Sequence, residues 1–198
     1  MSLSSYLNES IALIEKTAQL IDDERMNAVV DVVVMALGAG KPLLVCGNGG
    51  SAADAMHITG ELVGRFLLER RALKAICLAD NPAVLTAWSN DYSFETVFAR
   101  QVEAYGEPGA VLLGLSTSGN AANVVAAFEA ARASAVVTVA FTGEGGGRLA
   151  PLADHLLAVP SRNTAMIQQS HICLYHYLCS AVEDRIAAGD RERLAFQL

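Results

Sequence analysis

The chain is poor in charged residues, which make up only 18% of its 198 residues, and its formal net charge is −7. Apart from the pair Arg70-Arg71 it has no cluster of basic residues, which argues against binding to nucleic acid or to an anionic membrane surface. Because 53% of the residues are hydrophobic, polar side chains are too few to cover a lone monomer. We therefore expect the chain to bury apolar surface by self-association.

Targeting signals and long apolar runs are also missing. Residues 1–9 lack a basic stretch followed by an apolar block, so no signal peptide is expected. The most apolar window, 28–46, is broken by charged residues, glycines and a proline and cannot cross a bilayer as one helix. The four cysteines show no CxxC spacing, and Cys46 and Cys77 end apolar strand-like runs, so we expect reduced thiols. These absences together predict a cytoplasmic protein.

The chain does contain a regular alternation of strand-like and helical segments. The strand-like runs are 43–46, 75–78, 111–115, 136–141 and 155–159. The helical segments are 4–38, with a break at Asp22-Asp23, then 51–65, 82–90, 94–104, 120–133 and 167–186. Runs this uniformly apolar are typical of a parallel sheet with helices on both faces. The sequence predicts one doubly wound α/β domain over 1–198, with mainly five parallel strands and an N-terminal helical pair (1–40) that packs in an oligomer.

The most informative motif is the glycine loop Cys46-Gly-Asn-Gly-Gly-Ser51, between the first strand-like run and a helix. Its backbone N–H groups and the helix N-terminus that follows are suited to holding a phosphate. The loop also satisfies the dinucleotide pattern GxGxxA, which requires an acidic residue about twenty positions further on, at the tip of the second strand. Here the second run ends near Asp80, more than thirty residues away. We therefore expect no nucleotide cofactor.

A second loop, Ser116-Thr-Ser-Gly-Asn120, follows the third strand-like run. Its three hydroxyls and its backbone donors can saturate a phosphate without a cation. The alternative is an ordinary helix N-cap, since Ser, Thr and Asn favour that position. Ligands of such folds bind at the carboxyl ends of the strands, where further small polar residues lie at 142–147 and 160–164.

Two residues of the helix after the glycine loop, His57 and Glu61, are four positions apart and share one helix face. The pair suits proton transfer or metal binding. A solvated glutamate and a hydrogen-bonded histidine are the alternatives. Asp54, one turn earlier, either orients the imidazole or favours the helix N-terminus.

The last helical segment carries the polar residues Gln168, His171 and His176 among apolar ones. Burying polar residues on a helix this apolar costs free energy unless they are hydrogen-bonded or serve a functional site. We expect one of the two histidines to face a site, but the pattern does not decide which.

Taken in order, these motifs resemble the phosphoheptose isomerases of the sugar-isomerase (SIS) domain superfamily. The resemblance covers essentially the whole chain and rests on the pattern from Cys46 to Glu61, Asn90-Asp91, Ser116–Asn120, Phe141-Thr-Gly143, Ile167-Gln168 and His176. It implies interconversion of sedoheptulose 7-phosphate and D-glycero-D-manno-heptose 7-phosphate, the entry step to the heptose units of bacterial surface glycans. It also implies a homotetramer with active sites at subunit interfaces.

The resemblance assigns roles to individual residues. Glu61 matches the catalytic base and His176 the partnering acid. The substrate would be held by Asn48, Gly49, Gly50, Ser51, Glu61, Asn90, Asp91, Ser116, Thr117, Ser118 and Gln168. A zinc ion, reported for some members, would be held by His57, Glu61, Gln168 and His176.

Zinc on two histidines, a carboxylate and an amide oxygen is chemically reasonable, but a metal on Glu61 would compete with its role as base. Gln168 and His176 are eight residues apart, about 12 Å of axial rise in one helix. Either Gln168 leans forward from the helix start, or neighbouring subunits complete the site.

Aldose–ketose isomerisation needs a base, an acid for the oxygens and stabilisation of an enediolate, which agrees with this assignment.

The chain departs from the family at Ala121, where many members have a serine, and at 163–166, including Ala165, where some carry an aspartate. Two alternatives remain open. One is a non-catalytic scaffold for a protein such as the bacterial replication initiator, and the other is a sensor or isomerase for another sugar phosphate. The presence of both Glu61 and His176 favours the isomerase.

Overall fold

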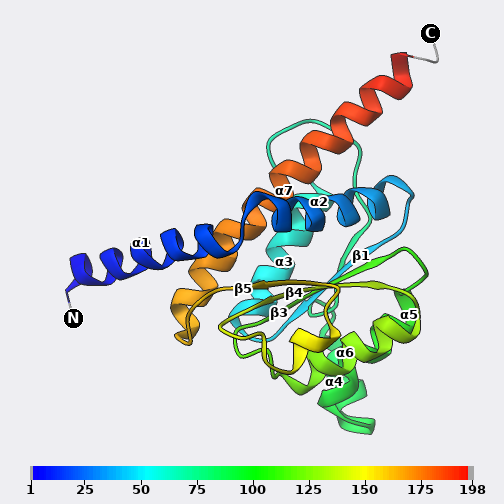
Figure 1. Cartoon of the computed structure of the whole chain (residues 1–198). Helices are drawn as coiled ribbons and strands as arrows, with labels where there is room; N and C mark the ends of the chain where they lie inside the picture. The colour runs from blue at the N-terminus through cyan, green and yellow to red at the C-terminus, as the bar shows by residue number, and fades with distance from the viewer. Residues whose placement is uncertain (1, 196–198) are drawn as a thin grey trace.

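Five parallel strands form one sheet in the computed structural model, which describes residues 2–195 (Figure 1). The strands are β1 (Leu43–Gly47), β2 (Ala75–Cys77), β3 (Val111–Ser116), β4 (Val137–Thr142) and β5 (His155–Ala158). Their order is β2–β1–β3–β4–β5, and every neighbouring pair is parallel. The chain winds outward from β1 to β2 and then returns to β3, so the direction of winding reverses between β1 and β3. Doubly wound sheets bind their ligands at this switch point.

The helices occupy nearly all of the segments that the sequence predicted. They are α1 (Leu3–Leu20), α2 (Asp23–Gly38), α3 (Gly50–Val63), α4 (Pro82–Asp91), α5 (Val97–Tyr105), α6 (Ala122–Ala133) and α7 (Thr164–Ala195). The expected helix over 94–104 is divided into a 3₁₀ turn, η1 (Phe94–Thr96), and α5, because the Ser93 side chain caps a tighter first turn. A second 3₁₀ segment, η2 (Gly147–Leu152), was not predicted.

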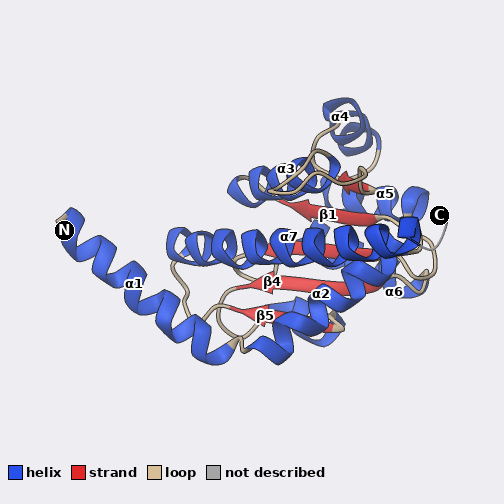
Figure 2. Ribbon diagram, turned by 90° about the horizontal axis from the view of Figure 1, so that it is seen from above, coloured by secondary structure: helices blue, strands red, loops and turns tan. Residues whose placement is uncertain are grey.

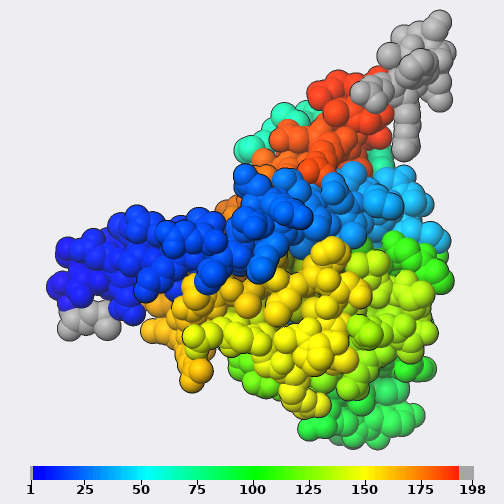
Figure 3. All heavy atoms as spheres, viewed as in Figure 1, coloured from blue at the N-terminus to red at the C-terminus, as the bar shows by residue number. Residues whose placement is uncertain are grey.

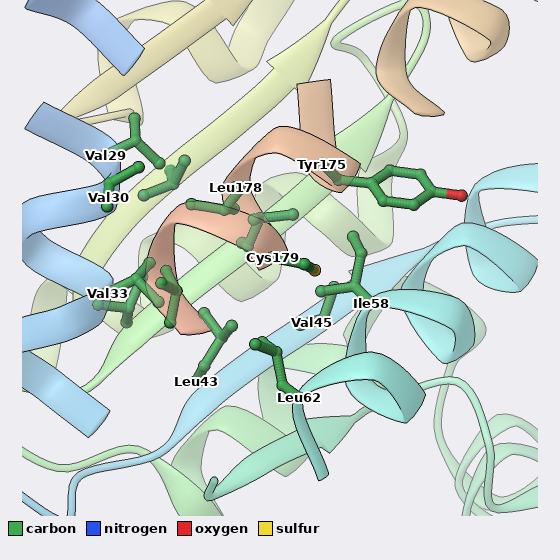
Figure 4. Close-up of a cluster of buried hydrophobic side chains, with 14 of the residues drawn as sticks. Val29, Val30, Val33, Leu43, Val45, Ile58, Leu62, Tyr175, Leu178 and Cys179 are labelled. Atoms are coloured by element: carbon green, nitrogen blue, oxygen red, sulfur yellow. The ribbon is translucent and has the colours of Figure 1, made fainter. Parts of the chain in front are cut away.

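Two hydrophobic cores lie on opposite faces of the sheet. Figure 2 shows α7 and α2 lying across the face of the sheet that is turned toward the viewer. Helices α2, α3 and α7 cover one face, and α5 and α6, with α4 beside them, cover the other. Alternation along β1 sends Leu43 and Val45 into the first core and Leu44 and Cys46 into the second. Figure 4 shows the first core where α2, α3 and α7 meet the sheet. This double coverage explains why the strand sequences are mainly apolar and show no regular alternation with polar residues.

The two N-terminal helices differ in what they bury. Helix α2 contributes Val29, Val30 and Val33 to the core of its own chain. Helix α1 projects from the body as an arm (Figure 3). It presents a row of apolar side chains that are 40–74% exposed, namely Leu3, Leu7, Ile11 and Ile14. No helix within residues 2–195 is both long enough and apolar enough to cross a membrane.

Candidate active site

Two helix N-termini without side-chain caps meet at the switch point of the sheet. Helix α3 starts after Gly49, which has a positive φ of 55°, and helix α6 starts after Ala121, and neither has a side-chain cap. The hydroxyls of the second loop therefore do not cap α6. The Oγ of Ser118 instead accepts a hydrogen bond from the backbone N of Asn120 at 3.1 Å. Uncapped N–H groups at two adjacent helix starts favour an anion, so the geometry supports the phosphate interpretation of both loops.

A reciprocal pair of amides holds the two loops together. The Nδ2 of Asn48 donates to the Oδ1 of Asn123 at 2.8 Å, and the Nδ2 of Asn123 donates back to the Oδ1 of Asn48 at 2.9 Å. Asn123 lies in the first turn of α6 and is 2% exposed. Sequence reasoning did not identify it, although an amide on the buried face of a first helical turn is an unusual choice.

The other polar loops at this edge of the sheet have supporting roles. The N of Gly143 donates to the carbonyl of Thr117 at 3.0 Å, which fixes the second loop from behind. Gly119, with φ +66°, lies so close to the backbone of Gly146 that a Cβ would sit 2.1 Å from its carbonyl oxygen. The turn before α7 acts as a cap, because the Oδ1 of Asn163 accepts from the backbone N of Ala165 at 3.1 Å.

A cluster of acid/base side chains forms where α3 packs against α7. The Nε2 of His57 lies 3.0 Å from the Oε1 of Glu61. The ring centroid of His176 lies 5.1 Å from that of His57 in an edge-on arrangement, and the ring of Phe66 flanks His176 at 5.7 Å. The structure therefore brings together His57, Glu61 and His176 from two helices far apart in the sequence.

The other histidine of α7 has a structural role. His171 is fully buried, and its Nε2 lies 3.1 Å from the carbonyl oxygen of Thr142 at the end of β4. Burial lowers the pKa of His171 to about 4, against a smaller opposing effect of this hydrogen bond, so the ring is neutral at pH 7. The question left open by the sequence is thereby answered, since His176 is the histidine of α7 that faces the cluster.

Asp54 does not contact His57 through a hydrogen bond of its own. Tyr175 lies between them, with its hydroxyl 3.3 Å from the Oδ1 of Asp54 and 3.0 Å from the Nδ1 of His57. Burial raises the pKa of Asp54, although the Tyr175 hydroxyl and the charge of His57 oppose the rise. Sequence reasoning missed Tyr175, because a tyrosine in an apolar helix is normally part of the core.

Three predicted site residues lie away from this cluster. The side-chain amide of Gln168 packs against Gly50, where a Cβ would lie 2.5 Å from its Nε2. Seven residues separate Gly50 from His57, about 10 Å of axial rise along α3. Asn90 and Asp91 end α4 and hydrogen bond to each other at 2.9 Å. Among the side chains described for residues 2–191, no hydrogen bond joins these two to the glycine loop or to the acid/base cluster.

The predicted zinc ligands do not all converge within one chain. His57 and Glu61 are paired and His176 is beside them, but the amide of Gln168 is about two turns of α3 away. Among the side chains of residues 2–191 no three His, Cys, Asp or Glu are arranged to hold an ion. The fit to zinc in a single subunit is therefore incomplete, and the shared coordination of an ion by these four residues stays a prediction.

A buried ion pair anchors the end of α3. The carboxylate of Glu183 accepts hydrogen bonds from the three backbone N–H groups of residues 66–68 at 2.6 to 2.9 Å. The Nε of Arg70 lies 3.3 Å from it, and both side chains are only 1% exposed. Arg70 also donates to the carbonyl oxygens of Glu61 and Gly64 at 2.8 and 2.9 Å. The loop after α3 is thus fixed to α7, and with it the helical turn that carries Glu61.

Known proteins are similar to this chain in sequence and in fold. The SIS domain family matches residues 5–143. A phosphoheptose isomerase from Crocosphaera subtropica is 52% identical over 159 residues, covering 80% of this chain and 81% of that protein. One from Aquifex aeolicus is 48% identical over 176 residues, covering 89% and 90%. The structure of the phosphoheptose isomerase from Neisseria gonorrhoeae has a TM-score of 0.87 at 38% identity, covering 92% of this chain and 97% of that chain. The chain therefore belongs to the SIS domain family and, within it, to the phosphoheptose isomerases.

Proposed function

We propose that the protein interconverts sedoheptulose 7-phosphate and D-glycero-D-manno-heptose 7-phosphate. The observation that carries this proposal is the pairing of Glu61 with His57, beside His176, on a helix that begins at an uncapped, glycine-rich N-terminus. A carboxylate held by an imidazole suits proton abstraction from carbon, and the helix start suits the phosphate. The cytoplasm, where sugar phosphates are made, is the proposed location.

The phosphate is bound by uncharged donors. We assign this role to Ser116, Thr117 and Ser118 together with the backbone N–H groups at the starts of α3 and α6. Both helix dipoles place partial positive charge where the dianion would lie. Two helix ends and several hydroxyls can supply the hydrogen bonds without a lysine or arginine, in keeping with the acidic composition of the chain.

The reaction moves one proton between neighbouring carbons. Glu61 takes a proton from C1 of the ketose while the carbonyl oxygen at C2 takes a proton from His176, which gives an enediol. The proton on Glu61 then returns to C2, the hydroxyl at C1 gives its proton back to His176, and C1 becomes the aldehyde. No electron is gained or lost overall, so the isomerisation is redox-neutral.

We further propose a homotetramer with active sites at subunit interfaces. Three observations support it: the exposed apolar row on α1, the position of Asn90 and Asp91 at the far end of α4, and the length of α3. Gly50 and Glu61 are eleven residues apart, about 16 Å of axial rise, which is a long span for one sugar phosphate. A site shared between two copies of the chain would not require one sugar phosphate to span this distance. Light scattering coupled to size-exclusion chromatography measures the mass.

Zinc remains a prediction from the sequence, and no step above depends on it. Bound to His57 and Glu61, the ion would act as a Lewis acid that polarises the sugar oxygens. Elemental analysis of chelator-treated and untreated protein measures its presence directly.

Gly50→Ala is expected to weaken substrate binding without weakening the fold. The new Cβ would meet the Nε2 of Gln168 at 2.5 Å and displace that amide, while alanine is the better residue inside a helix. If the amide contacts the sugar, loss of one hydrogen bond raises KM about tenfold. The matched control is Gly60→Ala on the same helix, where a Cβ meets nothing within 4 Å. Equal KM values in the two variants would exclude a binding role for Gln168.

Isotope exchange tests the proposed function. The purified protein is incubated with sedoheptulose 7-phosphate in deuterated water, and the sugars are analysed by mass spectrometry and NMR. We expect aldose to form and deuterium to appear at C1 of the ketose or C2 of the aldose. Fructose 6-phosphate serves as the comparison sugar. Exchange with it alone would indicate another sugar-phosphate isomerase, and exchange with neither sugar would indicate a binding protein or scaffold.

A further inference from the structure

We propose that Tyr175 is a positioning residue that orients His57 and, through it, Glu61, an inference that rests on the proposed isomerisation. The Tyr175 hydroxyl is the second member of a continuous series of polar contacts that runs from Asp54 through Tyr175 and His57 to Glu61. None of the four side chains can turn without breaking a contact to the next one in the series.

The ring of Tyr175 is anchored in the first hydrophobic core. The residue is 1% exposed and packs with neighbours that include Ile58, Leu178 and Cys179. Figure 4 shows its ring pointing out of this cluster, with the hydroxyl at the outer end. A buried aromatic ring has few alternative rotamers, so its hydroxyl is held in one place. The fixed oxygen lies 3.0 Å from the Nδ1 of His57 and 3.3 Å from the Oδ1 of Asp54.

The series of contacts sets the orientation of the His57 ring. A tyrosine hydroxyl carries one hydrogen, which it can donate to Asp54 or to His57 but not to both at once. When Tyr175 donates to Asp54, the Nδ1 of His57 donates to Tyr175. When Tyr175 donates to His57, a protonated Asp54 donates to Tyr175. In either case the Nδ1 contact is satisfied, and the same edge of the ring faces Tyr175.

The consequence for Glu61 follows from the other ring nitrogen. With Nδ1 tied to Tyr175, Nε2 is directed at the Oε1 of Glu61, 3.0 Å away. When Tyr175 donates to Nδ1, the hydrogen of a neutral ring lies on Nε2, and an ionised glutamate, the form that a base requires, accepts it through this oxygen. When Nδ1 donates to Tyr175, Nε2 carries a hydrogen for Glu61 only in the imidazolium form. The second oxygen of Glu61 is then left to take the proton from carbon. Tyr175 therefore acts on the reaction without touching the substrate, in the way that partners of active-site histidines generally do.

The first test compares two tyrosines of α7. Tyr175→Phe keeps the ring in the core and removes the hydroxyl, while Tyr177→Phe removes a hydroxyl from a 48% exposed side chain on the same helix. We expect Tyr175→Phe to lower kcat about 10- to 100-fold with KM changed less than about twofold. Tyr177→Phe should leave both constants unchanged. A wild-type kcat in Tyr175→Phe would overturn the proposal, as would a loss of kcat only in proportion to protein unfolded at the assay temperature.

The second test reads the His57 ring directly. The chain has four histidines, so protein labelled with ¹⁵N in the histidine rings gives few signals, and those of His57 are identified by their absence in His57→Gln. We expect Tyr175→Phe to shift the Nδ1 and Nε2 resonances of His57 and Tyr177→Phe to leave them in place. Unchanged resonances in Tyr175→Phe would overturn the proposal. This readout needs no turnover, so a wild-type protein inactive on the heptose would contradict the proposed function and leave this test standing.

Discussion

Glu61→Gln is expected to lower kcat for heptose isomerisation by about 10³-fold, the range over which general bases contribute to catalysis. Glutamine has the size of glutamate and can still accept a hydrogen bond from the Nε2 of His57, which lies 3.0 Å from the carboxylate. It cannot take a proton from carbon, so both turnover and deuterium exchange should disappear together. The rate of aldose formation and the isotope content of the recovered ketose measure the two effects.

The matched control for this variant is Glu69→Gln, which removes an 88% exposed carboxylate in the loop after α3. It should leave kcat and KM unchanged, because an exposed ion pair contributes little. Size-exclusion chromatography should show the same oligomer for both variants and for His176→Ala, which is also expected to be inactive. Near-normal turnover in Glu61→Gln would exclude Glu61 as the base.

Glu183→Ala is expected to cause the largest loss of stability. It leaves the three backbone N–H groups of residues 66–68 without their acceptor and Arg70 buried without a counter-ion. Removal of one partner from a buried ion pair typically costs about 3–5 kcal/mol. For a chain of this length that corresponds to a fall of about 10 °C in Tm. Calorimetry at a fixed protein concentration measures it, because the Tm of a self-associating protein depends on concentration.

The control for Glu183 is its neighbour Asp184, which is exposed, and Asp184→Ala should change Tm by no more than about 2 °C. The pH dependence gives a second check. Burial alone would raise the pKa of Glu183, but the N–H donors of residues 66–68 and Arg70 hold it below its ordinary value of 4.5. The stabilisation is then complete above pH 4.5 and is lost as the pH falls through the folded-state pKa. A Tm difference that is small at pH 7, or that grows in acid, would contradict this account.

Much of the fold was predictable because its signals are local. Each strand is an apolar run, and the breaks at Asp22-Asp23 and around Pro42 end helices by known rules. The alternation of strands and helices placed the glycine loop and the Ser116–Asn120 loop at the carboxyl ends of strands, where such folds bind ligands, and so predicted a phosphate site there. The apolar residues of α1 can also be read from the sequence, but their pattern does not say which molecule covers them.

The supporting contacts of the site were not predictable, because they join side chains far apart in the sequence. Asn48 and Asn123 are 75 positions apart, and His57 and Tyr175 are 118 apart. The sequence singled out Asn48 and His57, but their partners Asn123 and Tyr175 have common local explanations as a residue of a first helical turn and a core residue, so the pairing was not evident. The positions of Gln168 and Asn90 relative to the acid/base cluster depend in the same way on tertiary packing and assembly.

One straight helix, α7, carries the residues that serve every part of the site. Gln168 lies beside the start of α3, Tyr175 and His176 beside its middle, and Glu183 beyond its end. Their spacing of seven or eight residues keeps them within an arc of about 100° facing α3. Insertion of a single residue near position 170 would rotate three of them away together. An insertion of seven residues would restore the rotation but would shift the later residues about 10 Å along the axis, so the length of α7 between Gln168 and Glu183 is tied to the length of α3.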